Sequence, residues 1–374
     1  MRMMRKVLFL IESLGGGGAE KVLATIVKYI NKKKFDVTVC VISGGGRYEK
    51  EVEREVRLHA ILKSPSSYRG AQKIWYWIKY KMIYNWLPER IVYGLFVPKR
   101  NDVEVAFVEG FATRLLASST NKHAKKIAWV HCDLENQPWP ISCGVYKDLK
   151  EEKMAYGRYD TVACVSKRVE DVMREYYGVS NAITIYNPID MDRIRDLAFQ
   201  KCDWQVDTSK YNIVSVGRLE VVKGYDKLVS IVCDIRNVGV DVHLWLIGEG
   251  AEGKNLRCLV KDMGMESNVT FTDFLTNPYS LMSQMDFFVC SSKAEGFSLV
   301  ILEAILLGLP VISMNCGGPR ELIEETGGGV LCDSYEELGE RILQFLKMKH
   351  GAVDVKDTFS VCKIISQIES LLDK

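Results

Sequence analysis

Two glutamates and the turn between them form the clearest chemical pattern in this chain. Glu295 lies in a predicted loop, and Glu303 follows eight residues later inside a predicted helix over 299–307. The helix would begin near Gly296–Leu299, where free backbone N–H groups and the positive end of the helix dipole attract anions. Glu295 would repel a phosphate there, so its expected partners are sugar hydroxyls. The alternative is that both are ordinary helix charges, although an unpaired carboxylate among the leucines around Glu303 would be costly.

A second segment presents two cations beside a predicted strand. The stretch V-S-V-G-R-L-E-V-V-K-G-Y leaves that strand at Gly217 and places Arg218 and Lys223 about one helical turn apart. Two cations at the carboxyl end of the first strand of a doubly wound domain suit a diphosphate. Solvated loop charges remain the alternative, because Lys and Arg are usually exposed.

A run of glycines follows the first predicted strand. Gly15, Gly16, Gly17 and Gly18 permit close backbone approach to a ligand. Glu20 stands where a G-x-G-x-x-G fingerprint counted from Gly15 would have its last glycine, and no acidic residue follows the second predicted strand. The G-K-[ST] of a P-loop is also missing, so the pattern disfavours an NAD-dependent dehydrogenase.

Two further motifs keep a structural and a functional interpretation open. His131 ends a predicted strand in W-V-H-C-D, where it is either a hydrogen-bonded structural residue or part of a site. Asp190 and Asp192 have the D-x-D spacing of metal-dependent transferases. After Asn187-Pro188 we expect them to cap the next helix instead, because an octahedral ion needs more oxygen ligands. The sequence therefore predicts no metal site.

Length and composition indicate two globular domains. The chain has 374 residues, more than one ordinary core accommodates, and no apolar run approaches the roughly 18–20 residues of a membrane-spanning helix. Its eleven scattered cysteines indicate reduced thiols and a cytoplasmic location. Residues 1–190 carry 31 Lys and Arg against 21 Asp and Glu, a net of +10, whereas residues 191–374 carry 19 against 27, a net of −8. The basic half is expected to face something anionic.

Strands alternate with helices throughout, which predicts two doubly wound parallel sheets in an α/β protein. Ligands should bind at the carboxyl ends of the strands, in a cleft between the two domains. We place the first domain at 1–187 and the second at 188–355, and we expect 356–374 to be a helix that crosses back to the first domain. The predicted strands are 6–11, 37–42, 103–107, 126–130, 161–165 and 183–186, followed by 213–216, 243–247, 269–272, 287–290 and 311–313.

Taken together, these segments resemble retaining glycosyltransferase family four, whose two Rossmann-like domains form the GT-B fold. The resemblance covers nearly the whole chain. Its specific elements are Glu295-Gly296-Phe297-Ser298-Leu299 with Glu303, and G-R-L-x-x-x-K-G at 217–224. Supporting matches are Gly15–Gly18 with Ala19-Glu20, Val130-His131, Cys164–Ser166, Tyr186–Asp190 and Ile247–Gly250.

The resemblance implies roles for these residues. Arg218 and Lys223 would hold the diphosphate of a nucleotide-sugar donor, for example a UDP-hexose or UDP-N-acetylhexosamine. Glu295 would meet the donor sugar and Glu303 the ribose, while His131 and the glycine loop would come from the other domain. Further donor contacts are implied for Gly15, Gly16, Gly17, Gly217, Gly248, Phe274, and the backbone of Phe297, Ser298 and Leu299. No cofactor or metal is expected, because the cations and helix dipole would do the work of Mg²⁺.

The acceptor implied by the resemblance is a lipid-linked saccharide in surface polysaccharide synthesis. Residues 68–100 suit that interpretation, with seven Lys or Arg, one acid and nine aromatic residues. A basic and aromatic stretch predicts contact with the anionic inner face of the cell membrane, through Arg69, Lys73, Lys79 and Lys81. An ordinary helix pair packed on the first domain is the alternative. No nucleic-acid partner is expected.

Two other functions stay open. A nucleotide-sugar epimerase of the same shape would act on the donor without an acceptor. A catalytically inactive partner subunit would bind the sugar nucleotide without turnover, although the presence of Glu295, Glu303, Arg218 and Lys223 argues against it.

Overall fold

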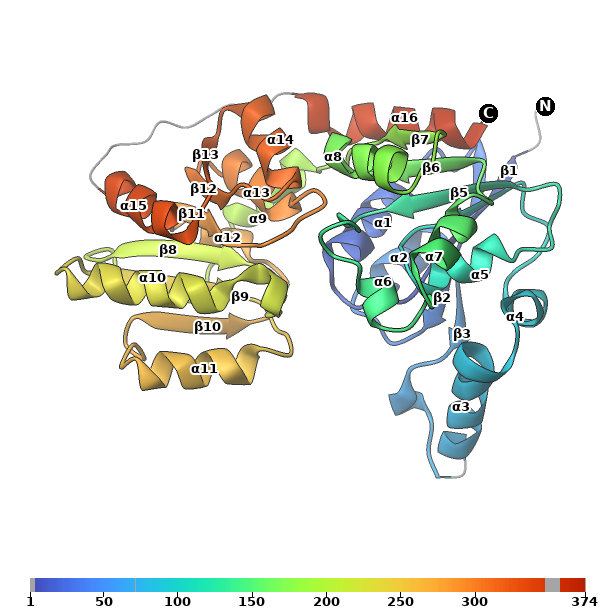
Figure 1. Ribbon diagram of the computed structural model, residues 1–374, viewed down its shortest axis with the longest axis horizontal. Helices are drawn as coiled ribbons and strands as arrows, with labels where there is room; N and C mark the ends of the chain where they lie inside the picture. Colours follow the sequence, from blue (N-terminus) through green and yellow to red (C-terminus); the bar gives the residue numbers. More distant parts are fainter. Residues whose placement is uncertain (1–3, 71, 347–356, 374) are drawn as a thin grey trace. The chain divides into compact units, whose positions relative to one another are not determined.

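The computed structural model describes residues 4–70, 72–346 and 357–373. The chain divides into two compact units. Unit 1 comprises residues 1–188 and 358–374, and unit 2 comprises residues 189–357. Each unit contains one parallel sheet with helices around it (Figure 1). The prediction of two Rossmann-like α/β domains is confirmed.

The sheet of unit 1 has seven strands in the order β3-β2-β1-β4-β5-β6-β7. Its neighbouring strands pair in parallel, and the residues of β1 from Val7 to Leu10 have no exposed surface. Such strands are covered on both faces, which explains why their sequences are continuously apolar. The strands are β1 (Arg5–Ile11), β2 (Phe35–Ser43), β3 (Arg57–Leu62), β4 (Val103–Ala106), β5 (Lys125–Val130), β6 (Thr161–Cys164) and β7 (Ala182–Thr184).

Most helices of unit 1 connect one strand to the next. They are α1 (Gly18–Tyr29), α2 (Glu49–Glu55), α3 (Gln72–Lys81), α4 (Glu89–Phe96), α5 (Phe111–Ala117), α6 (Trp139–Ser142), α7 (Leu149–Tyr156) and α8 (Lys167–Asp171). Short 3₁₀ or π segments are η1 (Pro65–Ser67), η2 (Met82–Trp86), η3 (Val172–Tyr176) and η5 (Asp357–Phe359).

The last helix, α16 (Val361–Asp373), also belongs to unit 1. Its apolar face is buried, including Ile364, Ile368 and Leu372, which are fully covered. Polar contacts add to this packing: the Glu369 carboxylate accepts a hydrogen bond from the backbone N–H of Asn31 at 2.8 Å. Residues far apart in the sequence therefore complete one core.

The sheet of unit 2 has six strands in the order β10-β9-β8-β11-β12-β13. They are β8 (Tyr211–Val216), β9 (Val242–Ile247), β10 (Val269–Asp273), β11 (Phe287–Cys290), β12 (Val311–Met314) and β13 (Gly329–Cys332). The helical segments are α9 (Met191–Ala198), η4 (Val221–Lys223), α10 (Tyr225–Asn237), α11 (Gly253–Asp262), α12 (Tyr279–Met282), α13 (Leu299–Leu306), α14 (Gly318–Thr326) and α15 (Tyr335–Phe345).

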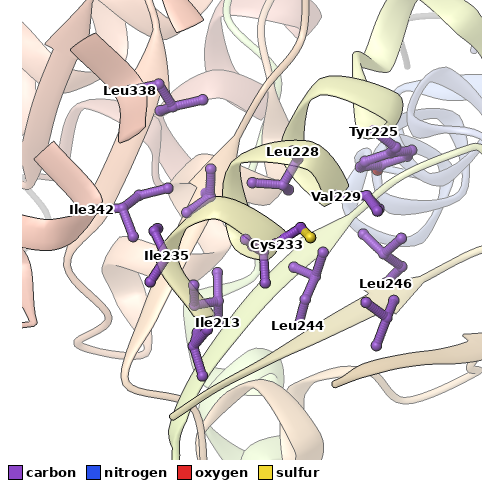
Figure 2. Close-up of a cluster of buried hydrophobic side chains, with 14 of the residues drawn as sticks. Ile213, Tyr225, Leu228, Val229, Cys233, Ile235, Leu244, Leu246, Leu338 and Ile342 are labelled. Atoms are coloured by element: carbon purple, nitrogen blue, oxygen red, sulfur yellow. The ribbon is translucent and has the colours of Figure 1, made fainter. Parts of the chain in front are cut away.

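One face of this sheet forms a hydrophobic core with α10 and α15. Ile213 and Leu244 from the strands meet Leu228 and Val229 of α10, with Ile342 of α15 beside them (Figure 2). Burying a side chain of this size contributes about 1.5–3 kcal/mol. The core fixes the strand ends from which the loops with Arg218, Lys223 and Glu295 emerge.

Two observations bear on the sequence predictions for metals and membranes. The Asp190 carboxylate accepts a hydrogen bond from the backbone N–H of Arg193 at 3.2 Å, so it caps α9, whereas Asp192 is exposed. Among the residues that the structure describes, no three His, Cys, Asp or Glu side chains form a cluster that could hold a metal ion. Within the same residues, no helix has the length and apolar character to cross a membrane.

Candidate active site

A buried ion pair joins the two segments of unit 2 that the sequence singles out. The Lys223 ammonium lies 2.6 Å from the Glu295 carboxylate, and the Ser292 hydroxyl donates to the same oxygen at 2.8 Å. Burial disfavours the charged lysine, but the attraction of Glu295, its hydrogen bond and the interactions with Tyr225 and Cys290 together outweigh burial and raise the pKa of Lys223 above its usual range. The lysine is therefore cationic at neutral pH, with Glu295 held in place beside it.

Backbone contacts hold the loops of this site together. Glu295 forms an isolated parallel bridge with Gly317, and its N–H donates to the Cys316 carbonyl at 3.2 Å. On the other side, Gly224 has a left-handed φ of 64°, and a Cβ there would lie 2.3 Å from the carbonyl oxygen of Ser291. The loops after β8, β11 and β12 thus meet at the carboxyl edge of the sheet.

Gly248 permits a further close approach beside β8. A Cβ on Gly248 would lie 2.1 Å from the carbonyl oxygen of Gly217, and its φ of 141° disfavours other residues. The Gly217 N–H donates to the backbone carbonyl of Ile247, and the Leu219 N–H donates to the backbone carbonyl of Glu249. Gly217 and Gly248 therefore act first as close-packing residues that position the Arg218 loop.

The amino end of α13 lies next to Glu295 in the chain. Phe297 and Ser298 are buried, and the Ser298 hydroxyl oxygen has no hydrogen-bond partner among the described residues. A buried polar atom without a partner is unusual in folded proteins, and a bound ligand would satisfy it. Leu299 begins the helix, and Glu303, one turn further, is only 2% exposed.

Arg218 and Phe274 occupy neighbouring loops with more solvent contact. The Arg218 side chain is 68% exposed and pairs with Glu220 at 3.1 Å. The Phe274 N–H lies 3.3 Å from the Glu249 carboxylate. Beside these loops is a cavity of about 510 Å³, lined by residues that include Leu219, Glu249, Arg257 and Asp273. The structure does not bring Arg218 into the Lys223–Glu295 pair, although both cations follow β8.

Two thiols lie close to the ion pair and were not singled out from the sequence. The hydrogen bond from the Cys316 thiol lowers the pKa of Cys290 to about 7, against the effect of burial. Both thiols also interact electrostatically with Glu295 and Lys223. Cys290 is buried at the end of β11, and Cys316 is partly exposed.

Unit 1 carries its own group of polar residues at the carboxyl ends of strands. Burial lowers the pKa of His131 to about 3, so the imidazole is neutral at physiological pH. One ring nitrogen bonds to the backbone of Phe107, and Nε2 is buried without a partner among the described residues. A neutral imidazole held this way presents a hydrogen-bond acceptor to a ligand hydroxyl.

Glu109 supports the His131 loop and is a residue that the sequence interpretation missed. Its buried carboxylate accepts hydrogen bonds from the backbone N–H groups of His131 and Cys132. Burial raises the pKa of Glu109, partly opposed by these hydrogen bonds. Its position just after β4 was the signal available in the sequence, because acids at strand ends often serve a site.

The glycine loop lies at the carboxyl end of β1 and the start of α1. Gly16 has a φ of 132°, and Gly17 is the N-cap of α1. A Cβ on Gly17 would meet the Glu20 carboxylate at 2.5 Å. Gly15 is exposed, so its backbone is accessible to a ligand.

The four cations predicted to face a membrane are not equivalent. Arg69, Lys73 and Lys81 are exposed. Lys79 instead points into unit 1: its ammonium donates to the Ile61 carbonyl at 2.6 Å and lies 5.0 Å from the centre of the Phe96 ring. Burial accordingly lowers the pKa of Lys79, and its charge serves the packing of α3 rather than the outer surface.

Two family models match adjoining parts of the chain. The model for Glycosyltransferase Family 4 matches residues 16–193, and the model for Glycosyl transferases group 1 matches residues 198–357. Together with the two Rossmann-like units, these matches define a GT-B enzyme that transfers glycosyl groups. The chain is a family 4-like glycosyltransferase with the GT-B fold.

Similar proteins span nearly the same length. An uncharacterized glycosyltransferase of Haemophilus influenzae is 26% identical, with 99% of this chain and all of that protein covered. Also 26% identical is the Campylobacter jejuni N-acetylgalactosamine-N,N'-diacetylbacillosaminyl-diphospho-undecaprenol 4-alpha-N-acetylgalactosaminyltransferase, with 89% and 87% covered. Among solved structures, Anabaena HepE in complex with UDP and glucose superposes with a TM-score of 0.74 at 20% identity, covering 99% of this chain and 100% of that chain.

Proposed function

We propose that this enzyme is a retaining transferase that moves a hexose or N-acetylhexosamine from a UDP-sugar onto a hydroxyl of a lipid-linked saccharide. The observation that carries the proposal is the Lys223–Glu295 pair beside the amino end of α13. A cation and the positive end of a helix dipole suit the diphosphate, and the carboxylate suits sugar hydroxyls. Support for UDP comes from the structural neighbour with UDP and glucose, and support for a lipid diphosphate acceptor comes from the name of the Campylobacter relative.

The proposed reaction needs no protein nucleophile. The bond between the anomeric carbon and the β-phosphate oxygen breaks, and the acceptor oxygen attacks from the same face. The departing phosphate takes the acceptor proton, so the anomeric configuration is retained. Negative charge grows on the leaving UDP, where Lys223 and Arg218 stabilise it without a metal ion. Glu303 would hold the ribose, Phe274 would lie near the base, and His131 would accept a hydrogen bond from the sugar.

The direct test is a screen of UDP- and GDP-sugars, first for binding and then for transfer. A true donor at 100 times its dissociation constant should stabilise the protein by about 2.7 kcal/mol in thermal unfolding. Transfer to a synthetic lipid-diphosphate saccharide, with the product anomer read by NMR, then tests retention. Conversion of a UDP-sugar without an acceptor would indicate an epimerase instead. Loss of activity in EDTA with rescue by Mn²⁺ would contradict metal independence.

We also propose that unit 1 binds the anionic cytoplasmic face of the membrane, where such an acceptor would lie. Exposed tryptophans and cations occur along α3, η2 and α4, which we call the arm (residues 72–96). Trp75 is 70% exposed and Trp86 59%, beside exposed Lys73 and Lys81. Several large apolar side chains exposed within one segment suit an interaction site, and tryptophan favours the lipid interface. Each basic residue near such a surface contributes about 1 kcal/mol.

Vesicle co-sedimentation tests the membrane proposal. Replacing Arg69, Lys73 and Lys81 with Gln should weaken binding to phosphatidylglycerol vesicles at low salt, whereas the same replacement of exposed Lys33, Lys122 and Lys150 should have a smaller effect. Both triple variants remove the same charge, so a difference between them reports the position of the charge. Equal losses, or no binding by the wild type, would contradict the proposal.

A further inference from the structure

A row of tyrosines covers the inner face of the arm. Tyr76, Tyr80 and Tyr84 are spaced four residues apart, which places them on one side of a helix. The ring centres of Tyr76 and Tyr80 are 6.4 Å apart, and those of Tyr80 and Tyr84 are 4.6 Å apart. Tyr84 continues the row onto Phe111, the first residue of α5, at 4.6 Å.

The tyrosine row ends on a partly buried carboxylate. The Tyr84 hydroxyl donates a hydrogen bond to Glu12, the residue directly after β1. Burial raises the pKa of Glu12, and the hydrogen bond from Tyr84 opposes that effect in part. At the other end of the row, Tyr76 hydrogen-bonds the side chain of Ser43, the last residue of β2. The arm is thus fastened to the carboxyl ends of two neighbouring strands.

This attachment lies where a ligand site is expected. The strand order β3-β2-β1-β4 reverses direction between β1 and β4, and such sheets bind ligands at the carboxyl edge of that reversal. Glu12 follows β1, and Phe111 opens the helix after β4. The glycine loop begins at Gly15, three residues beyond Glu12. Tyr84 therefore connects the arm to the segment that leads into this loop.

The element that carries Tyr84 also carries exposed surface. Residues Met82–Trp86 form a π-helix, a rare conformation that often occurs at functional sites. Within it Tyr84 contacts Glu12, whereas Trp86 is exposed. Tyr84 and Trp86 belong to the same short segment. We therefore expect a movement of Trp86 to shift Tyr84 and to change its hydrogen bond with Glu12.

We propose that Tyr84 and Glu12 couple the arm to the Gly15–Gly18 loop, so that binding of the arm to an anionic bilayer orders that loop. The two residues are positioning residues, and the inference rests on the membrane contact proposed above. Ordering the loop only at the membrane would confine acceptor binding to the surface where a lipid-linked acceptor lies. The exposed Trp and Lys side chains bind the lipid, and the Tyr84 hydroxyl transmits the effect.

Hydrogen exchange tests the coupling without knowledge of the acceptor. The full chain is compared with and without vesicles of phosphatidylglycerol and phosphatidylethanolamine, and exchange is read in peptides that contain Gly15–Gly18. In the wild type, vesicles should slow this exchange by about threefold or more, as ordering of a mobile loop does. Tyr84→Phe keeps the ring stack and should bind vesicles normally, but the slowing should disappear.

Matched variants make the result specific. Tyr93→Phe removes a hydroxyl from a second Tyr–Glu pair of unit 1, Tyr93 with Glu104 at 2.6 Å, and should leave the vesicle effect intact. Glu12→Met breaks the proposed contact from the other side and should act like Tyr84→Phe. Glu12→Gln retains an acceptor oxygen and should keep most of the effect.

The outcomes separate this inference from the transferase proposal. An unchanged loop in vesicle-bound wild type, or a Tyr84→Phe protein that responds like wild type, would overturn the coupling. If the wild type does not bind vesicles, the coupling falls with the membrane contact. In each case UDP-sugar turnover is measured separately with soluble protein, so the transferase proposal stands or falls on its own assay.

Discussion

The Lys223–Glu295 pair contributes both to the stability of unit 2 and to the proposed reaction. Both side chains are largely buried, so removing either leaves the other charge with poor solvation. A diphosphate arriving at this place would compete with Glu295 for the lysine. The pair thus keeps the cation charged and oriented before the donor binds, which lowers the reorganisation needed when charge develops.

Replacing Lys223 should affect catalysis more than donor binding. Lys223→Met replaces the lysine by an unbranched side chain of similar length without the charge. The kcat should fall by about 10²–10³, because charge on the leaving phosphate grows in the transition state. Lys227→Met, at an exposed position four residues on, is the control and should be near wild type. Steady-state kinetics with the donor found in the screen gives the answer. Near-normal kcat in Lys223→Met would remove the lysine from the proposed site.

The two glutamates should differ in which kinetic constant they change. Glu303→Gln should chiefly raise the donor KM, because ribose contacts change little during reaction. Glu295→Gln should lower kcat or broaden the choice of sugar, since its partners belong to the transferred group. Kinetics with two UDP-sugars for each variant separates these effects. The same loss for both variants with both sugars would contradict separate roles.

The partly buried His131 makes the stability of unit 1 depend on pH. Its pKa of about 3 lies below the ordinary value near 6.5, so between these values the unfolded chain binds a proton that the folded chain does not. Stability should therefore fall as pH decreases from 6.5 towards 3, with a contribution of at most about 1.4 kcal/mol per pH unit. His131→Gln should flatten the pH dependence of the urea midpoint, whereas exposed His123→Gln should not. Parallel curves for wild type and His131→Gln would contradict this prediction. The pH dependence would then come from groups that both proteins contain, such as Glu109.

At the scale of elements, the site depends on how closely loops of unit 2 approach each other. Gly248→Ala places a Cβ 2.1 Å from the Gly217 carbonyl oxygen and strains a positive φ. We expect a loss of several kcal/mol in stability, together with weaker donor binding, because the Arg218 loop must move. Gly339→Ala in α15 meets its nearest atom at an ordinary 3.5 Å and should be neutral or stabilising by up to about 1 kcal/mol. Thermal unfolding and donor titration of both variants provide the measurement, and equal behaviour would contradict the packing role of Gly248.

The sequence predicted the central strands better than the edge strands. Strands such as β1 and β9 are covered on both faces along most of their length, so they are largely apolar and easy to recognise. The sequence interpretation missed β3 and β13, which are edge strands. In β3, Arg57 and His59 alternate with apolar residues, and β13 begins at Gly329 after two further glycines. Both patterns are typical of loops as well as of edges, and only pairing with the neighbouring strand distinguishes them.

The same limit applies to the candidate site. Glu295 was recognisable by its spacing from Glu303, and Lys223 by its spacing from Arg218. The 2.6 Å contact between Glu295 and Lys223, however, joins residues 72 positions apart. Glu109 and Glu12 are single acids after strands, and no local pattern separates them from ordinary loop acids. Lys79 shows the converse: a basic residue in a basic segment turns inward because a carbonyl and an aromatic ring are within its reach.

At the scale of the whole molecule, the two units differ in charge. The chain up to residue 190 has a net charge of +10, and the remainder has −8. An anionic bilayer would attract the first and repel the second, with both effects decaying over a Debye length of about 8 Å at physiological salt. The proposed membrane contact would therefore act on unit 1.

The chain enters unit 2 after Pro188 and returns to unit 1 at Thr358, so unit 2 is an insertion within the sequence of unit 1. Cutting either connecting peptide alone leaves the halves tethered by the other, and α16 stays bound to unit 1 through its buried apolar face. For engineering, a donor-binding module from another enzyme must be grafted at both junctions, with α16 left in place. A chimera made at the first junction alone would replace part of the core of unit 1 with a foreign helix.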